Sequence, residues 1–287
     1  MLLEPQVPFP VSSDHRVRPD LVKLDEPIFL VDREFPKYFA QKLEAFAHQT
    51  ASAALAPGHD PKAVAEALRW LWNRIPKEHL REPLEYTPEN TYGVARFEID
   101  PAPLQVPPEN PLEFGKIAAL CVQEDLVLMH GTTLEAAWVC FPSNWNPAEK
   151  VGRSFAEIHI PVPHSEKLLS AQENVAKAMS QKGPYVRHVW GLGFDPRLSY
   201  HPECKLLQDG QTIYFRCERQ VTVPLPELNR SWFLIRVYMT PIEQVADTPE
   251  RKQALLEAVR TMPEAHRAYK GGTLRAFAAL ELRGFFD

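Results

Sequence analysis

The sequence predicts an α+β fold, in which helices flank and interrupt an antiparallel sheet. Apolar residues recur at helical spacing early in the chain, and short strand-like runs follow, separated by turn signals. The 287 residues are enough for one large domain, and 45% apolar with 24% charged residues is ordinary for a folded protein. The 28 prolines, against 12 glycines, indicate many extended or looped segments between short elements.

Helices are predicted at both ends of the chain. Residues 1–30 are punctuated by proline and are expected to wrap around the surface of a larger body. Helices follow at 32–49, where apolar side chains recur three and four residues apart, and at 61–72, which begins with proline. The stretch 82–113 reads mainly as loop, and the last 40 residues are expected to contain two further helices, at 250–260 and 274–282.

The middle of the chain holds the predicted sheet. Its strands are expected at 116–122, 126–130, 134–141, 185–194, 211–223 and 231–240. Helices are expected between them at 147–159 and 165–181, the second ending at Gly183-Pro184. Asp209-Gly210 is a hairpin signal. We therefore divide one compact domain into an N-terminal extension (1–84), a core (85–245) and C-terminal helices (246–287).

Composition excludes several classes of protein. The net charge of −5 and pI of about 6.1 do not suit a nucleic-acid surface, which needs a clustered basic face. The four cysteines stand far apart, so neither a zinc site nor a disulfide framework is expected. The first residues lack the basic start and long apolar core of a signal peptide, and no apolar run approaches the roughly 20 residues of a membrane span. We expect a cytoplasmic protein with no membrane contact.

A capped helix is predicted to begin at Asn146. Asparagine is a strong N-cap and proline is favoured next, here Pro147. Glu149 then stands where its carboxylate can reach back to the amide of the cap. Pro161 disfavours helical geometry at the residue before it, so the helix should end near His159.

His159 shares the apolar face of this helix with Val151, Phe155 and Ile158, so it should lie buried in the last turn. The ordinary interpretation is a core histidine bonded to a neighbouring carbonyl. The functional interpretation is a metal ligand, and a lone histidine suits haem better than zinc. Haem iron needs only one axial ligand from the protein, whereas zinc needs about three or four.

The segment from Phe141 to Pro163 resembles the hallmark of the haem-dependent oxidative N-demethylase alpha subunits. It reads Phe-Pro-Ser-x-Trp-x-Pro-x-Glu-Lys-x-Gly and, further on, Ile-His-x-Pro-Val-Pro. Other motifs agree in order across roughly residues 25–280. They are Val122-Gln123-Glu124-Asp125-Leu126, Arg187-x-x-Trp190, Arg216-x-Glu218-Arg219-Gln220, Pro224-Leu225-Pro226, Phe233-x-Ile235-Arg236-x-Tyr238 and Tyr269-Lys270.

The resemblance implies a PAS-like antiparallel sheet with a helix that holds haem b through one histidine. His159 is the best match to that proximal ligand. The implied activity is oxidative removal of a methyl group from a secondary amine such as dimethylamine, with release of formaldehyde. Electrons would come from NADPH through partner subunits that carry FMN and a 2Fe-2S cluster, and tetrahydrofolate on a folate-binding subunit would capture the formaldehyde. The family often has asparagine where this chain has Val189.

Two alternatives stay open. The same scaffold could serve as a haem-based gas or ligand sensor without catalytic activity, or the fold could have no haem, with His159 as a core residue. If haem binds, Trp145, Val151 and Phe155 should contact it from the His159 segment. Lys150 and Arg153 are candidate partners for a haem propionate, as is Arg219 on the predicted sheet.

Polar side chains on two predicted strands complete the candidate site. Tyr214, Arg216, Glu218 and Gln220 should point one way, and Arg219 the other; in the next strand Trp232, Leu234, Arg236 and Tyr238 share a face. If these strands pair, Arg216, Glu218 and Arg236 could form one network. It would be either a solvated ion-pair ladder or the lining of the distal haem pocket.

In the functional interpretation, Glu218 and Arg236 are the catalytic candidates: the carboxylate would hold the ammonium of the substrate, and the guanidinium would polarise bound oxygen. Arg216, Tyr238 and Trp190 are further candidates for contact with the amine and with dioxygen.

Overall fold

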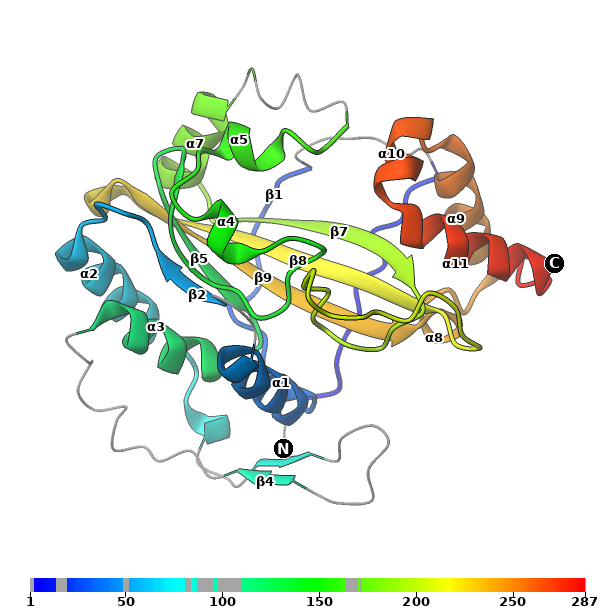
Figure 1. The fold of residues 1–287 in the computed structure, drawn as a ribbon, viewed down its shortest axis with the longest axis horizontal. Coiled ribbons are helices and arrows are strands. Elements are labelled where there is room, and N and C mark those ends of the chain that lie inside the picture. Colours follow the sequence, from blue (N-terminus) through cyan, green and yellow to red (C-terminus); the bar gives the residue numbers. More distant parts are fainter. Residues whose placement is uncertain are drawn as a thin grey trace.

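A seven-stranded antiparallel sheet forms the centre of the computed structural model (Figure 1). The structure describes residues 3–13, 20–48, 52–80, 84–86, 95–97, 110–163, 170 and 172–286. Its strands, in spatial order, are β1 (Val22–Lys23), β7 (Tyr185–Gly193), β8 (Tyr214–Leu225), β9 (Arg230–Pro241), β5 (Asp125–His130), β6 (Thr133–Trp138) and β2 (Ala53–Leu55). A separate pair joins β3 (Leu84–Tyr86) to β4 (Ala95–Phe97). The predicted α+β class and antiparallel sheet are confirmed.

Helices cover both faces of the sheet. They are α1 (Phe35–His48), α2 (Pro61–Trp72), α3 (Pro111–Leu120), α4 (Pro147–Lys150), α5 (Phe155–His159), α7 (Gln172–Gln181), α8 (Ile242–Val245), α9 (Pro249–Thr261), α10 (Glu264–Tyr269) and α11 (Gly271–Leu282). The short 3-10 turns are η1 (Glu78–Leu80) and η3 (Pro226–Leu228). No helix of the described residues has the length and apolar character needed to cross a membrane.

Most predicted elements are confirmed, and α2 has the predicted bounds because Asp60 caps it and Pro61 opens it. The predicted strand at 116–122 was wrong: this apolar run lies in α3, which Asn110 caps and Pro111 starts. The predicted tight hairpin at Asp209-Gly210 was also wrong, because the connection from β7 to β8 is long and takes up residues 194–213. Most of the predicted loop 82–113, and residues 165–169 and 171 of the predicted helix 165–181, lie outside the described residues.

The register of the sheet decides which side chains share a face. Across β8 and β9, Glu218 pairs with Val237 and Arg219 pairs with Arg236. Directly opposed residues project to the same side of an antiparallel sheet. We call the side of Glu218 the front face and the side of Arg219 the back face.

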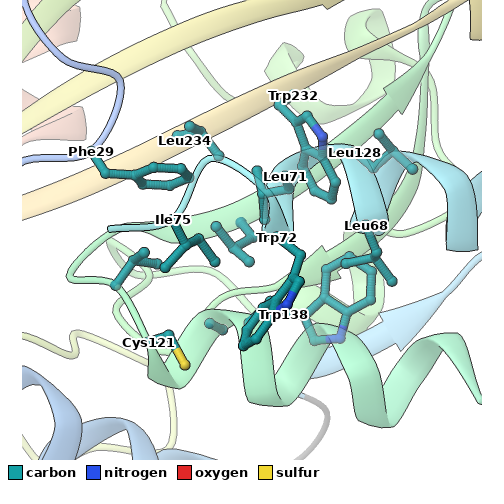
Figure 2. Packing of buried hydrophobic residues seen from close by; sticks show 14 of the residues in the cluster. Phe29, Leu68, Leu71, Trp72, Ile75, Cys121, Leu128, Trp138, Trp232 and Leu234 are labelled. Carbon is teal, nitrogen blue, oxygen red and sulfur yellow. The ribbon is translucent and has the colours of Figure 1, made fainter. Parts of the chain in front are cut away.

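The back face carries the larger core. Trp138 and Trp232 from the sheet pack 6.3 Å apart between ring centroids, and Leu68 and Leu71 of α2 belong to the same buried cluster (Figure 2). A second buried cluster joins α8, α9 and α11 to β7, β8 and β9. The front face is covered at one end by α4, α5 and α7 and elsewhere by α1 with the 194–213 connection. Its middle, around Glu218, is only half-buried.

Candidate functional site

The histidine singled out by the sequence ends a short helix rather than one long helix. α4 stops at Lys150, the chain passes through Gly152 at a φ of +86°, and α5 begins after Ser154. Ser154 and Glu157 form a capping box, in which each side chain accepts from the other's backbone amide. The predicted single helix at 147–159 was wrong because a left-handed glycine and a second N-cap interrupt it.

The interruption fastens this segment to the start of β6. Gly152 N donates to Leu134 O at 2.8 Å, and Leu134 N donates to Arg153 O at 3.0 Å. The predicted N-cap of α4 is confirmed, since the Asn146 side chain accepts from Ala148 N at 3.0 Å. The backbone therefore fixes α5, and with it His159, at the front of the sheet.

His159 is half-buried, where full burial was predicted, and its ring has a defined tautomer. Nδ1 lies 2.7 Å from the carbonyl oxygen of Phe155. A carbonyl only accepts, so Nδ1 carries the proton and Nε2 of the neutral ring keeps its lone pair. Burial lowers the pKa of His159, and the nearby charges of Arg187 and Lys150 lower it further. The neutral, ligand-competent form of the ring is therefore favoured.

The other predicted cofactor contacts on this segment have two different surroundings. The Phe155 ring packs against His159, with 4.1 Å between ring centroids. Trp145 and Val151 pack, together with Ile158, against an apolar cluster that includes Val127 of β5. These last three side chains anchor the segment to the front face.

Glu218 is the centre of a polar network on the front face. Its Oε1 accepts from Ser143 Oγ at 2.6 Å, and its Oε2 accepts from Gln220 Nε2 at 2.8 Å. Arg216 lies 3.5 Å from the carboxylate and also donates to Ser143 Oγ at 3.0 Å. The side chain of Glu218 retains 15% of its exposure, so one carboxylate with spare lone pairs borders the open part of this face.

Arg187 extends this network toward His159. Its Nε donates to Gln220 Oε1 at 2.7 Å, so the amide of Gln220 links the arginine to Glu218. Arg187 is also one of the two cations that lower the pKa of His159. β7 thereby connects the histidine segment with the carboxylate.

Lys270 contacts β7 at Trp190, close enough to Glu218 for the two charges to interact. Its Nζ donates to the carbonyl oxygen of Trp190 at 2.7 Å and lies 5.2 Å from the centre of the Trp190 ring. Burial lowers the pKa of Lys270 to about 8, and the charge of Glu218 acts against that shift. α10 ends at Tyr269, just before Lys270.

The predicted network is confirmed for Arg216 with Glu218 but was wrong for Arg236, which lies on the back face. Arg236 donates to the Asp32 carboxylate and to the Leu30 carbonyl, and it lies 4.5 Å from the centre of the Tyr238 ring. Trp190 is stacked on Phe215, a back-face residue, with 6.1 Å between ring centroids. Arg236, Tyr238 and the Trp190 ring are therefore separated from Glu218 by the sheet.

Arg219, predicted as a propionate partner, is also on the back face and is only 1% exposed. It donates to Glu26 Oε1 at 2.7 Å and to the carbonyl oxygens of Pro27 and Ile28 at 2.8 and 3.1 Å. These three acceptors belong to the N-terminal segment that crosses the back of the sheet. Arg219 is occupied in holding this segment, so Lys150 and Arg153 remain the candidate partners for a propionate.

Tyr238 lines a separate hollow of about 460 Å³, formed by the N-terminal segment, α1 and the end of β9. Two cations of this hollow already have acidic partners: Arg33 pairs with Glu4, and Arg251 pairs with Asp247. This hollow is distinct from the His159 and Glu218 region.

The motif Val122–Leu126 has a structural role. Gln123 accepts from Asp32 N at 2.9 Å, and Asp125 accepts from the amides of Cys140 and Phe141 at 3.0 and 2.9 Å. The carbonyl oxygens of residues 119, 122 and 124 all accept from Nζ of Lys42, which is fully buried. The motif therefore joins α1, α3 and the N-terminal segment.

The residues near His159 fit the chemistry of a haem. Nδ1 bonded to a carbonyl is the arrangement that orients ligating histidines, and it leaves Nε2 for iron. Within the described ranges, no group of three or more His, Cys, Asp or Glu side chains gathers as a metal site. A single histidine suits haem, whose iron takes its remaining ligands from the porphyrin and from small molecules.

Sequence reasoning did not include Ser143, Arg187, Gln220 and Lys270 among the site residues. Each of them lies within one of the family-like motifs, and that membership was the available signal. Two of them reach the site through contacts between distant parts of the sequence. Ser143 is bonded to Arg216 and Lys270 to Trp190, and each pair is 73 or more positions apart.

The comparison with protein families agrees with this geometry. A family model described as haem-dependent oxidative N-demethylase, alpha subunit-like, matches residues 22–277. That range contains every element of the seven-stranded sheet and the whole of the site described above. The chain therefore belongs to the haem-dependent oxidative N-demethylase alpha subunit-like family.

Proposed function

We propose that this protein is a haem-dependent monooxygenase that oxidatively removes a methyl group from a small secondary amine, with His159 as the residue that would hold haem b. The observation that supports this most directly is the His159 ring, whose Nδ1 is bonded to the Phe155 carbonyl and whose Nε2 is left for iron. An antiparallel sheet with short helices on its front face is consistent with the PAS-like scaffold of such a domain.

Bound haem would supply the iron centre at which dioxygen is reduced. In the overall reaction, the N-methyl amine, dioxygen, two electrons and two protons give the demethylated amine, formaldehyde and water. One C–H bond of the methyl group gains an oxygen atom, and the C–N bond then breaks, with a proton returning to nitrogen. The second oxygen atom leaves as water.

The residues of this chain would bind and orient the amine. Glu218 has lone pairs left for an ammonium N–H, and Ser143 and Gln220 hold its carboxylate in place. Val189 lies directly across from Glu218 on the front face, where it offers apolar contact to the methyl group. The position at which relatives often have asparagine thus faces the proposed ammonium acceptor.

The electrons require a reductase partner. We propose NADPH-dependent partner subunits with FMN and a 2Fe-2S cluster, and a folate-binding subunit that takes up the formaldehyde in a cytoplasmic complex. The description of the family as alpha subunit-like supports the presence of other subunits.

The test is an absorption spectrum of the purified chain supplied with haem, compared between wild type and His159→Ala. We expect a Soret band in the wild type and its loss, or a large shift, in the variant. His48→Ala, at the exposed end of α1, is the matched control and should keep the wild-type band. Equal haem content in His159→Ala and wild type would contradict the ligand assignment.

Activity is tested separately, by amine-dependent oxygen consumption and formaldehyde release with a competent electron donor. The proposed function predicts one formaldehyde for each amine demethylated. Haem that binds through His159 without any amine-dependent oxygen consumption would contradict the monooxygenase and favour a sensor on the same scaffold.

A further inference from the structure

The front-face network carries more positive than negative charge. Arg187, Arg216 and Lys270 all lie near Glu218, which is the carboxylate at hydrogen-bond distance to Ser143 and Gln220. The other acid that acts on Arg187 is Asp20, which is exposed. A site with this balance does not favour a ligand whose only charge is an ammonium group.

The three cations differ in how far their donors are used. Arg216 donates to Phe141 O at 2.9 Å, to Leu198 O at 2.5 Å and to Ser143 Oγ, so all three guanidinium nitrogens have acceptors. Arg187 uses only Nε, on Gln220, among the described residues. Lys270 uses one of its three N–H bonds, on Trp190 O. Arg187 and Lys270 therefore keep donors for an anion.

The spacing of the charges matches a small zwitterion. The amide of Gln220 bridges Arg187 and Glu218: its oxygen accepts from the arginine and its nitrogen donates to the carboxylate. The width of one amide group and two hydrogen bonds therefore separates the guanidinium from the carboxylate. An α-amino acid has its ammonium and carboxylate on the same carbon. Lying beside Gln220, it can place its ammonium on Glu218 and its carboxylate on Arg187, with charge-assisted hydrogen bonds at both ends.

We propose, on the basis of the proposed function, that the amine demethylated by this protein carries a carboxylate and is an N-methylated α-amino acid. Glu218 binds the secondary ammonium, Arg187 binds the carboxylate, and Lys270, on Trp190 O of β7, adds positive charge nearby. Val189, opposite Glu218, contacts the N-methyl group. This assigns a substrate-binding role to Arg187 and Lys270.

The test compares N-methylglycine with dimethylamine on the full haem-loaded chain. Dissociation constants are measured by calorimetry and by the change in the Soret band, and formaldehyde is measured with an electron donor present. We expect N-methylglycine to bind about tenfold or more tightly than dimethylamine. Arg187→Met should reduce that ratio of dissociation constants about tenfold, whereas Arg69→Met, on the exposed side of α2, should preserve it.

The possible outcomes separate the two proposals. Turnover of dimethylamine with no preference for N-methylglycine would overturn the substrate class and leave the demethylase function standing. Binding and turnover of neither amine would overturn both. Loss of haem from Arg187→Met, measured as haem per chain, would show that the guanidinium holds a propionate and would overturn its assignment to the substrate.

Discussion

The two faces of the β8–β9 pair carry ionic networks that differ in how deeply their charged side chains are buried. On the back face, Arg219 and Arg236 are each 1% exposed, and their bonds end on Glu26, Asp32 and carbonyl oxygens of the N-terminal segment. On the front face, Glu218 is partly exposed, and Arg187, with Lys270 nearby on β7, has donors that find no acceptor among the described residues. The back network fastens one part of the chain to another, whereas the front network is open to a ligand.

This comparison separates two roles within the motifs that the chain shares with its family: some residues stabilise the fold, and others are open to a ligand. Glu218 and Arg219 are adjacent in one motif, yet the alternation of the strand sends them to different networks. Removing a member of the closed network should cost stability, and removing a member of the open network should cost ligand binding. The following variants test whether the two costs separate in this way.

The largest effect is expected from Arg236→Met. It leaves the carboxylate of Asp32 without its buried cation, and breaking a buried ion pair costs about 3–5 kcal/mol of unfolding free energy. Urea denaturation followed by circular dichroism measures this loss. Arg33→Met, which breaks an exposed pair with Glu4, is the control and should change stability little. A loss in Arg236→Met no larger than in this control would refute the closed network.

A smaller effect, of a different kind, is expected from Glu218→Gln. The affinity for the amine should fall about tenfold or more, because a hydrogen bond to a charged acceptor contributes about 1.5–3 kcal/mol. Stability should fall by only about 1 kcal/mol, since Arg216 keeps its two carbonyl acceptors. Calorimetric titration and urea denaturation measure the two quantities.

Glu227→Gln, on the exposed turn between β8 and β9, is the matched control for this charge change. It should alter neither quantity. If Glu218→Gln destabilised the fold as much as Arg236→Met and left amine affinity intact, the front network would be structural.

The sequence allowed the strands to be predicted but not the partners of their charges. The alternation of Arg216, Glu218 and Gln220 was correct, and so was that of Arg236 and Tyr238. The relative phase of the two strands depends on how η3 and the left-handed Asn229 connect them. A shift of one residue moves every side chain to the other face, so the Glu218–Arg236 pairing could not be decided from alternation alone.

The histidine segment was predictable in a similar, partial way. Asn146 and the proline after it do start a helix, and the helix that bears His159 ends before Pro161, as predicted. The break at Gly152 was readable as well, because Ser154 and Glu157 have the spacing of a capping box. The approach of Arg187 and Lys270 was not readable, since it depends on β7 and on the start of α11, far along the chain.

The smallest effect concerns the pH dependence of the open network. Burial lowers the pKa of Lys270 to about 8, so the lysine loses its charge as pH rises through that value. The carboxylate of N-methylglycine stays ionised over this range, and aliphatic amines titrate near 10. Of the other groups around Lys270, burial raises the pKa of Tyr269, which therefore stays neutral, and Glu218 is the adjacent acid.

The affinity for N-methylglycine should therefore fall about two- to fivefold between pH 7 and 9, since a bound carboxylate favours the protonated lysine. In Lys270→Met the affinity should be weaker at pH 7 and nearly constant over the same interval. Lys205→Met, at an exposed position of the 194–213 connection, should keep the wild-type pH dependence. Calorimetric titrations at several pH values measure these changes. An equal fall in wild type and Lys270→Met would mean that the lysine only seals the edge of β7 through Trp190 O, which would confine the open network to Arg187 and Glu218.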